Sequence, residues 1–233
     1  MPADPSPFTS PLLDAGGIAQ AGGKGANLAA LLRAGFAVPD GFVVTTDAYD
    51  RFVADHGLAG RVRALADAGD TAAVGGLFEG ATLAPDVADA IVAAYAALGG
   101  GPVAVRSSAT AEDLPGASFA GQQESYLNVT GPDAVLAAVR RCWASLWTER
   151  AVAYRAGRDA ASAGPLSIAV VVQQLVDAEV AGVMFTADPT TGRRDETVIT
   201  AAWGLGESVV GGTVDADAFR VRDGRVVEAT VGD

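Results

Sequence analysis

The hydrophobic pattern of this chain changes from a helical to a strand-like period at Gly99-Gly100-Gly101-Pro102. Before this point, apolar residues recur every three or four positions in alanine-rich stretches such as 86–98, which is typical of amphipathic helices. After it, short β-branched runs predict strands, and one long helical stripe is predicted over 133–157. The predicted strands are 103–105, 126–129, 167–176, 179–186, 197–203 and 218–221. Helices followed by a mixed portion of strands and helices predict an α+β fold rather than a regular βαβ alternation.

The charge balance argues against one class of partner. The 233 residues include 28 acidic and 16 basic side chains, which gives a formal net charge of −12. A nucleic-acid partner is not expected, because neutralising phosphates takes a basic face. There is no run of ~18 apolar residues and no secretory signal, so we expect a cytoplasmic protein without a membrane partner.

Two residue types that often carry chemistry occur once each. A single cysteine, Cys142, and a single histidine, His56, cannot form an internal disulfide or a zinc site. We expect Cys142 to be a small buried residue beside Trp143, and His56 to end a helix rather than to act as a catalyst.

The basic residues contain a sharper signal. Fifteen of the 16 are arginine, and the only lysine is Lys24, within Gly22-Gly23-Lys24-Gly25. Lysine is a compact charge and arginine a planar fork, so the two are not interchangeable. A lysine among glycines suits a phosphate oxygen that approaches closely, although a chance surface position is the alternative.

A second candidate phosphate site follows the strand predicted at 103–105. The stretch from Arg106 to Gln123 begins with a cation and contains glycines and small hydroxyl residues. Backbone amides in such a loop can surround phosphate oxygens, while arginine supplies a bidentate contact. A plain surface loop is the alternative. The pattern is neither a Walker A loop nor a dinucleotide-binding fingerprint.

Five motifs, in order along the chain, carry a resemblance to a known family. They are Gly22-Gly23-Lys24-Gly25-Ala26-Asn27-Leu28, the stretch from Val105 to Pro115, the stretch from Ser118 to Glu124, Gly182-Val183-Met184-Phe185-Thr186-Ala187-Asp188-Pro189, and Trp203-Gly204-Leu205-Gly206-Glu207. Together they resemble the N-terminal ATP-grasp domain of the phosphoenolpyruvate synthase and pyruvate phosphate dikinase family. Residues 185–194 and 171–174 are most similar to the rifampin phosphotransferase subgroup. The resemblance runs from about Leu12 to the last residue.

The resemblance implies an ATP-grasp-like α+β fold. We expect a mobile lead-in over 1–11, a first lobe with a helical insert over 12–165, and the start of a second lobe over 166–233. The family's acidic metal-binding segment, its Gln-Ser-Arg-Pro stretch and its phosphohistidine signature do not occur in these 233 residues. We therefore expect an incomplete second lobe, no metal ligands within this chain, and no conversion of ATP by the chain alone.

The resemblance also implies an activity and assigns site residues. The family binds ATP with Mg²⁺ and passes the β-phosphoryl group to a histidine on a swivelling domain, releasing AMP and phosphate. A further domain presents the acceptor, pyruvate or rifampin. The residues implied to bind ATP are Lys24, Arg106, Gly121, Ser125 and Gln173. Among them, Lys24 and Arg106 would be catalytic by neutralising the triphosphate, and Gln173 would lie near the adenine.

Two other classes of function stay open at this stage. One is a non-catalytic nucleotide-binding or scaffold module that keeps the fold without turnover. The other is a purely structural interaction domain, which would leave the Lys24 and Arg106 segments without a purpose.

Overall fold

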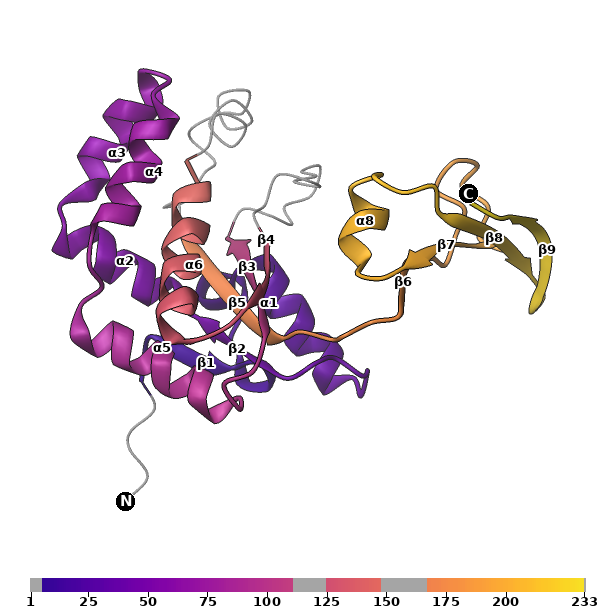
Figure 1. The fold of residues 1–233 in the computed structure, drawn as a ribbon, viewed down its shortest axis with the longest axis horizontal. Helices are drawn as coiled ribbons and strands as arrows, with labels where there is room; N and C mark the ends of the chain where they lie inside the picture. The colour runs from indigo at the N-terminus through magenta and orange to yellow at the C-terminus, as the bar shows by residue number, and fades with distance from the viewer. Residues whose placement is uncertain (1–5, 111–124, 148–166, 233) are drawn as a thin grey trace. The chain divides into compact units, whose positions relative to one another are not determined.

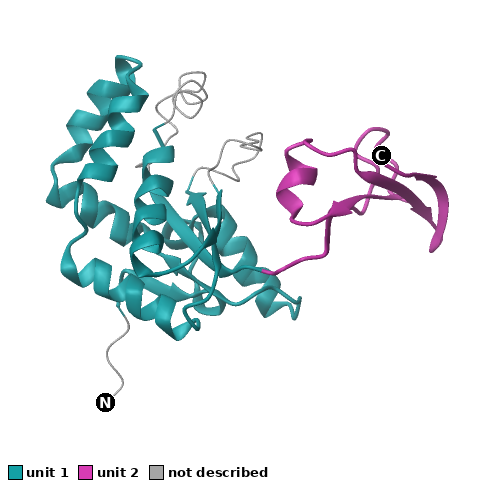
Figure 2. Ribbon diagram, in the orientation of Figure 1, with its two compact units in different colours: residues 1–175 teal, residues 176–233 magenta. Residues whose placement is uncertain are grey.

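The computed structural model describes residues 6–110, 125–147 and 167–232, and the chain divides into two compact units. Unit 1 covers residues 1–175 and unit 2 covers residues 176–233 (Figures 1 and 2). Gly121 and residues 148–157 of the helix predicted over 133–157 lie outside the described residues.

Unit 1 is built on a five-stranded antiparallel sheet with the strand order β1-β2-β5-β3-β4. The strands are β1 (Thr9–Pro11), β2 (Gly41–Val44), β3 (Val103–Ala109), β4 (Ser125–Val129) and β5 (Ile168–Gln174). The central strand β5 is buried from Ile168 to Gln173. Its continuous apolar run fits a strand that is covered on both faces.

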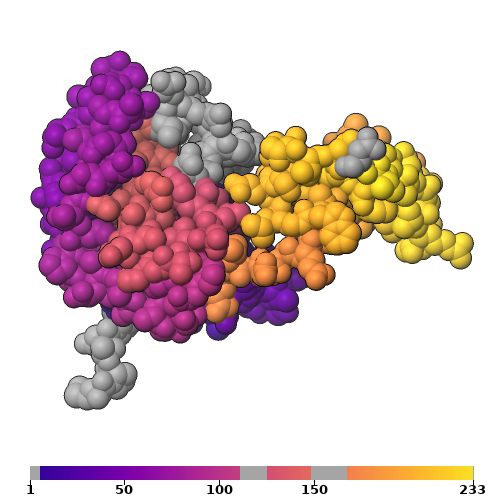
Figure 3. All heavy atoms as spheres, viewed as in Figure 1, coloured from indigo at the N-terminus to yellow at the C-terminus, as the bar shows by residue number. Residues whose placement is uncertain are grey.

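Helices cover the two faces of this sheet unequally. The helices are α1 (Ile18–Arg33), α2 (Thr46–Asp55), α3 (Leu58–Asp67), α4 (Thr71–Gly80), α5 (Pro85–Ala97) and α6 (Pro132–Ser145), with a 3-10 turn, η1 (Leu12–Asp14). Helices α2 to α6 share a large core with one face (Figure 1). In the space-filling view, atoms of this helical layer lie closely packed on the face of unit 1 that is shown (Figure 3). Helix α1 and η1 pack on the other face around a smaller core.

The alternation of β5 explains the two cores. Val170 and Val172 belong to the large core, whereas Ala169 and Val171 belong to the small core under α1. Successive side chains of a strand point to opposite faces, so one apolar run serves both layers.

Aromatic side chains fill the large core. Trp143 is fully buried, and its ring centroid lies 5.1 Å from that of Phe52 and 6.0 Å from that of Tyr49. Cys142 beside it is also fully buried, which confirms the predicted burial. His56 follows the last residue of α2, as predicted, and its Nε2 lies 2.8 Å from the carbonyl oxygen of Thr82.

Unit 2 is a four-stranded antiparallel meander. Its strands are β6 (Val180–Phe185), β7 (Thr197–Trp203), β8 (Asp217–Arg222) and β9 (Arg225–Thr230), in sequence order across the sheet. A short helix, α8 (Gly206–Val210), packs against β6 and β7. Several apolar side chains of this unit are exposed, and Trp203 is 81% exposed.

The structure corrects two expectations. The boundary between the units follows residue 175 rather than 165, because β5 is the central strand of the first sheet. The predicted strands 167–176 and 179–186 therefore belong to different sheets. Residues 9–11 of the predicted lead-in form the edge strand β1, paired with β2.

The start of α2 is fixed by residues on both sides of its first turn. The N-cap residue is Thr45, and Asp47 lies in the first turn. The Thr45 hydroxyl donates to the carbonyl of Pro7 at 2.7 Å. This bond ties the segment before β1 to the end of β2.

A cluster of ion pairs holds the long β6–β7 connection against β8. Asp188 is buried and pairs with Arg220, and its Oδ1 accepts hydrogen bonds from the amides of Thr190 and Thr191 at 2.8 and 3.3 Å. Glu196 is also buried and pairs with Arg222. The Arg220 guanidinium is the largest cause that holds the pKa of Asp188 well below its usual range. Hydrogen bonds from the Thr190 amide and from the hydroxyl and amide of Thr191 lower this pKa further.

A neighbouring pair in this cluster shows the same direction of shift. The hydrogen bonds from Arg193 lower the pKa of Asp195 from 3.8 to about 2. A carboxyl with a lowered pKa in the folded state stabilises that state fully above its ordinary pKa. Its contribution is lost as the pH falls through the folded value.

We expect Asp188→Asn to loosen unit 2 in a pH-dependent way, because Arg220 loses its buried anion. Hydrogen exchange of the β7 and β8 amides, followed by mass spectrometry, should be faster in the variant at pH 7. The difference should narrow as the pH falls below about 4. Asp223→Asn, the same change at an exposed turn position, is the control and should leave exchange in β7 unchanged. Equal exchange in Asp188→Asn and wild type at pH 7 would rule out a stabilising cluster.

The large core gives a second prediction. Phe78 is fully buried against Phe52, whereas Phe36 is 63% exposed. Phe78→Ala should lower the free energy of unfolding by about 3–5 kcal/mol because it leaves a cavity. Phe36→Ala should change it by about 0.5 kcal/mol or less. Urea unfolding followed by tryptophan fluorescence measures both, and similar losses for the two variants would contradict the core assignment.

Candidate functional site

The small-core face of the unit 1 sheet carries three of the sequence-predicted site residues. On this face, Arg106 of β3 pairs with Ser125 of β4 on one side and with Val171 of β5 on the other. Directly paired residues of neighbouring strands share a face. Since Val171 lies in the core under α1, Arg106 and Ser125 are on the α1 face of the sheet.

Gln173 lies on the same face, one pleat further along β5. It pairs with Ala104 of β3 and Gly41 of β2, and it is buried. Its side-chain Nε2 donates to the carbonyl of Pro39 at 2.9 Å. Gln173 therefore holds the turn before β2, and its predicted place near an adenine stays a prediction.

Helix α1 brings Lys24 to this face. The helix is interrupted at Gly22, whose φ of 67° and ψ of 177° are not helical. This region of backbone conformation is essentially restricted to glycine. A Cβ at Gly22 would also lie 2.0 Å from the carbonyl oxygen of Ser108. The glycine before Lys24 thus permits both the interruption and the close approach of α1 to β3.

Direct hydrogen bonds join the Lys24 segment to β3. The Ser108 hydroxyl accepts from the amide of Gly25 at 3.1 Å and donates to the carbonyl of Ala21 at 2.8 Å. Ser108 is two residues after Arg106, on the same face, and two residues along a strand span about 6.8 Å. The backbone on either side of Lys24 is therefore bonded to the strand that carries Arg106, although the two residues are about 80 positions apart in the chain.

This arrangement places the backbone around Lys24, the strand position of Arg106 and the first turn of the helical segment that starts after Gly22 on one sheet face. The two residues have cationic side chains, and the first turn of a helix carries partial positive charge. Such a combination is suited to an anion with several oxygens. Whether Lys24 and Arg106 contact one phosphate group stays a prediction, as does the role of Gly121, which lies outside the described residues.

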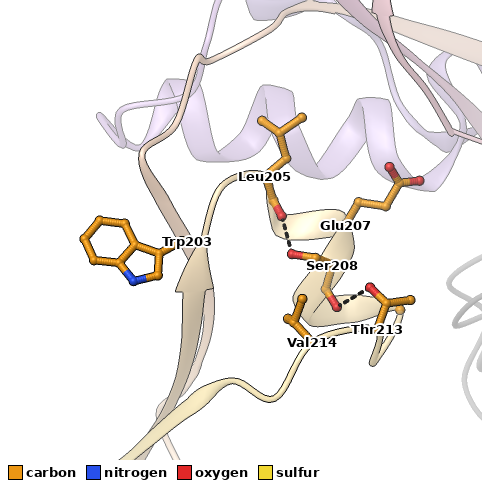
Figure 4. Close-up of a pocket in the computed structure, with 7 residues that line it drawn as sticks. Trp203, Leu205, Glu207, Ser208, Thr213 and Val214 are labelled. Atoms are coloured by element: carbon orange, nitrogen blue, oxygen red, sulfur yellow. Dashed lines mark hydrogen bonds between the residues drawn. The ribbon is translucent and has the colours of Figure 1, made fainter. Parts of the chain in front are cut away.

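A separate hollow lies in unit 2. It has a volume of about 700 Å³ and is lined by Trp203, Leu205, Glu207, Ser208, Gly211, Thr213 and Val214. Figure 4 shows the Ser208 hydroxyl directed to the carbonyl of Leu205, and Trp203 turned away from the other labelled side chains. Its one charged lining residue is Glu207. Because a carboxylate repels phosphate, the charge of this hollow does not suit a triphosphate.

Within ranges 6–110, 125–147 and 167–232, no three His, Cys, Asp or Glu side chains are grouped so that they could hold a metal ion. None of the helices in these ranges has the length and hydrophobicity that crossing a bilayer requires.

Comparison with known proteins gives the family. The family model that describes the pyruvate phosphate dikinase AMP/ATP-binding domain matches residues 18–233 of this chain. A rifampicin phosphotransferase from a Streptomyces species is 48% identical over 94% of this chain and 27% of its own length. A probable phosphoenolpyruvate synthase from Methanothermobacter thermautotrophicus is 46% identical over 91% of this chain and 34% of its own length. The chain thus spans about a quarter to a third of the length of these relatives.

The chain belongs to the family of pyruvate phosphate dikinase AMP/ATP-binding domains. Its α+β architecture of two antiparallel sheets with helices is the ATP-grasp-like fold that the sequence motifs indicate. The resemblance to this family is thereby confirmed.

Sequence reasoning missed Ser108. The residue is part of a quoted motif, but its hydroxyl was not singled out. The sequence does contain one indication of this residue: side chains two positions apart in a strand share a face, so Ser108 lies on the same face of β3 as Arg106. Its partners on α1 are 83 and 87 residues away, so only the tertiary structure reveals them.

The close approach at Gly22 predicts a large effect of a small substitution. Gly22→Ala should lower the free energy of unfolding by about 3 kcal/mol or more, because the added methyl group meets backbone at a forbidden dihedral angle. Gly57→Ala is the matched control, since Gly57 also has a positive φ of 58° but nothing lies within 4 Å of its Cβ position. It should lower the free energy of unfolding by only about 1 kcal/mol. Equal losses in urea unfolding would contradict the close approach.

Proposed function

We propose that this chain is the ATP-binding domain of a dikinase-type phosphotransferase. The enzyme transfers the β-phosphoryl group of ATP through a phosphohistidine on a swivelling domain to an acceptor, and it releases AMP and phosphate. The acceptor is rifampin or pyruvate. Relatives named for rifampicin phosphotransfer and for phosphoenolpyruvate synthesis are 48% and 46% identical to this chain, which supports both acceptors equally.

The single observation that supports this proposal most is the bonded junction between the Lys24 segment and β3. In a family of ATP-binding domains, a lysine whose neighbouring backbone is bonded to the strand that carries an arginine supplies two cations suited to a triphosphate. Phosphoryl transfer requires little covalent help from the protein, and most of the catalysis comes from alignment and charge stabilisation.

Each site residue has a proposed task. The Lys24 ammonium neutralises phosphate oxygens as a compact charge, and the Arg106 guanidinium binds them in a fixed bidentate geometry. Ser125, paired with Arg106 across the sheet, donates its hydroxyl to the same group of oxygens. Gly121 allows the loop backbone to approach, and Gln173 lies beside the adenine.

Magnesium enters this proposal with the nucleotide. The described residues hold no group of acidic side chains suited to a metal, so none of the steps above is assigned to a metal held by them. When bound, Mg²⁺ would neutralise part of the triphosphate charge. We place the protein in the cytoplasm, where ATP is abundant and where the buried thiol of Cys142 stays reduced.

Substitution of either cation tests the proposal. Lys24→Ala and Arg106→Ala should each weaken Mg-ATP binding to the 233-residue chain by about tenfold or more, because a charge-assisted hydrogen bond contributes ~1.5–3 kcal/mol. In the complete enzyme, each should slow phosphohistidine formation by roughly 10²-fold or more. Lys24→Arg should also bind poorly, since a planar head does not replace a compact one. Isothermal titration calorimetry measures the affinities.

Arg63→Ala is the control for these variants. Arg63 is exposed on α3, in the helical layer over the opposite face, and its loss changes the net charge by the same amount. It should bind ATP like the wild type. Wild-type affinity in both Lys24→Ala and Arg106→Ala would overturn the site. If the wild-type chain binds ATP but the complete enzyme forms no phosphohistidine, the domain would instead be a non-catalytic nucleotide-binding module.

A further inference from the structure

The Ser108 hydroxyl occupies a specific position in the hydrogen-bond pattern of α1. In a regular helix, the carbonyl of residue 21 accepts from the amide of residue 25, four positions later. The Ser108 hydroxyl binds both of these groups: it donates to the Ala21 carbonyl at 2.8 Å and accepts from the Gly25 amide at 3.1 Å. One side chain of β3 is therefore bonded to two backbone groups of α1 that are one helical turn apart.

The bonded groups lie on both sides of the interruption at Gly22. The dihedral angles of Gly22 separate the first turn of α1 from the rest of the helix. A buried carbonyl or amide that loses a hydrogen bond is costly. Ser108 is fully buried, so water does not easily replace it. One hydroxyl therefore links the two parts of α1 to β3.

The two bonded groups lie on either side of Lys24. Residues 21 and 25 bracket the Gly22-Gly23-Lys24 stretch, and both are tied to the same atom of β3. The close approach of Gly22 to the Ser108 carbonyl adds a steric limit at the same point. The backbone around Lys24 is thus held at Ala21, Gly22 and Gly25 relative to the strand that carries Arg106.

We propose that Ser108 is a positioning residue for phosphate binding: its hydroxyl, bonded to the Ala21 carbonyl and the Gly25 amide of α1, sets the place of Lys24 relative to Arg106. This inference rests on the proposed function, in which Lys24 and Arg106 bind the triphosphate. Preorganised charges bind more tightly than charges that must be ordered on binding. Ser108 itself does not touch the nucleotide in this account, and it acts through Lys24.

A merely structural Ser108 makes a different prediction. If the hydroxyl only satisfies buried backbone groups, its removal lowers stability without a preference for any ligand. If it positions Lys24, its removal weakens ligands that carry the outer phosphates and leaves AMP almost unaffected. The loss of ATP affinity on removal of the Ser108 hydroxyl must also disappear when Lys24 is replaced by alanine. Both substitutions would then act through the same contact between Lys24 and the phosphates.

The experiment is a double-mutant cycle on the 233-residue chain with ATP and AMP as the probes, measured by calorimetry. Ser108→Ala should weaken ATP binding at least about fivefold and AMP binding by roughly twofold or less, as expected for lost preorganisation. In a Lys24→Ala background, Ser108→Ala should cause no further loss of ATP affinity. Ser108→Cys, which keeps a weaker donor and acceptor in nearly the same volume, provides a milder variant with an intermediate ATP affinity if Ser108→Ala does not fold.

Thr46→Val is the matched control. The buried Thr46 hydroxyl also donates to α1, to the carbonyl of Ala19 at 2.8 Å, but it bonds only to the turn before Gly22. Its loss should lower the melting temperature by a few degrees, as a loss of about 1 kcal/mol does, and leave the ATP affinity unchanged. Wild-type ATP affinity in Ser108→Ala or Ser108→Cys, alongside a loss in Lys24→Ala, would overturn this inference alone. Wild-type affinity in Lys24→Ala as well would overturn the proposed function with it.

Discussion

Two hydrogen bonds of the Ser108 hydroxyl determine how the site of unit 1 is organised. The Ala21 carbonyl and the Gly25 amide of α1 are both bonded to this hydroxyl of β3. The close approach of α1 to β3 is possible only because Gly22 has no Cβ and adopts a conformation that other residues rarely reach. The small core beneath α1 has the same geometric origin, because it requires the helix to lie close to β3 and β5. Lys24 and Arg106 therefore belong to one packed structural unit.

The two faces of the unit 1 sheet have different roles because of the side chains of β5. Its alternating side chains supply the large core on one side and the small core on the other. The large core, with Trp143 and Phe78, stabilises the layer of α2 to α6 and carries no proposed site residue. The small core is flanked by polar residues, Arg106, Ser108 and Gln173, on neighbouring strand positions. Stability and binding are thus assigned to opposite faces of the same sheet.

Much of this architecture could be predicted from local patterns. The change of period at residues 99–102 matches the end of α5 at Ala97 and the start of β3 at Val103. The bias toward arginine made Lys24 conspicuous, and the five motifs identified the family. The boundary between the units was predicted ten residues too early, because an apolar run does not reveal which sheet it joins. The partners of Ser108 and the pairing of Asp188 with Arg220 depend on contacts between distant segments, which no local pattern encodes.

Because Lys24 is the only lysine in the chain, one labelling experiment tests its contact with the triphosphate most directly. An acyl-phosphate derivative of ATP transfers its acyl group to an amine that lies beside the terminal phosphates, and peptide mass spectrometry locates the product. We expect acylation of Lys24 that excess ATP prevents, with the N-terminal amine as an internal reference that ATP does not protect. No acylation of Lys24, or equal acylation with and without excess ATP, would contradict the claim that this residue binds the phosphates.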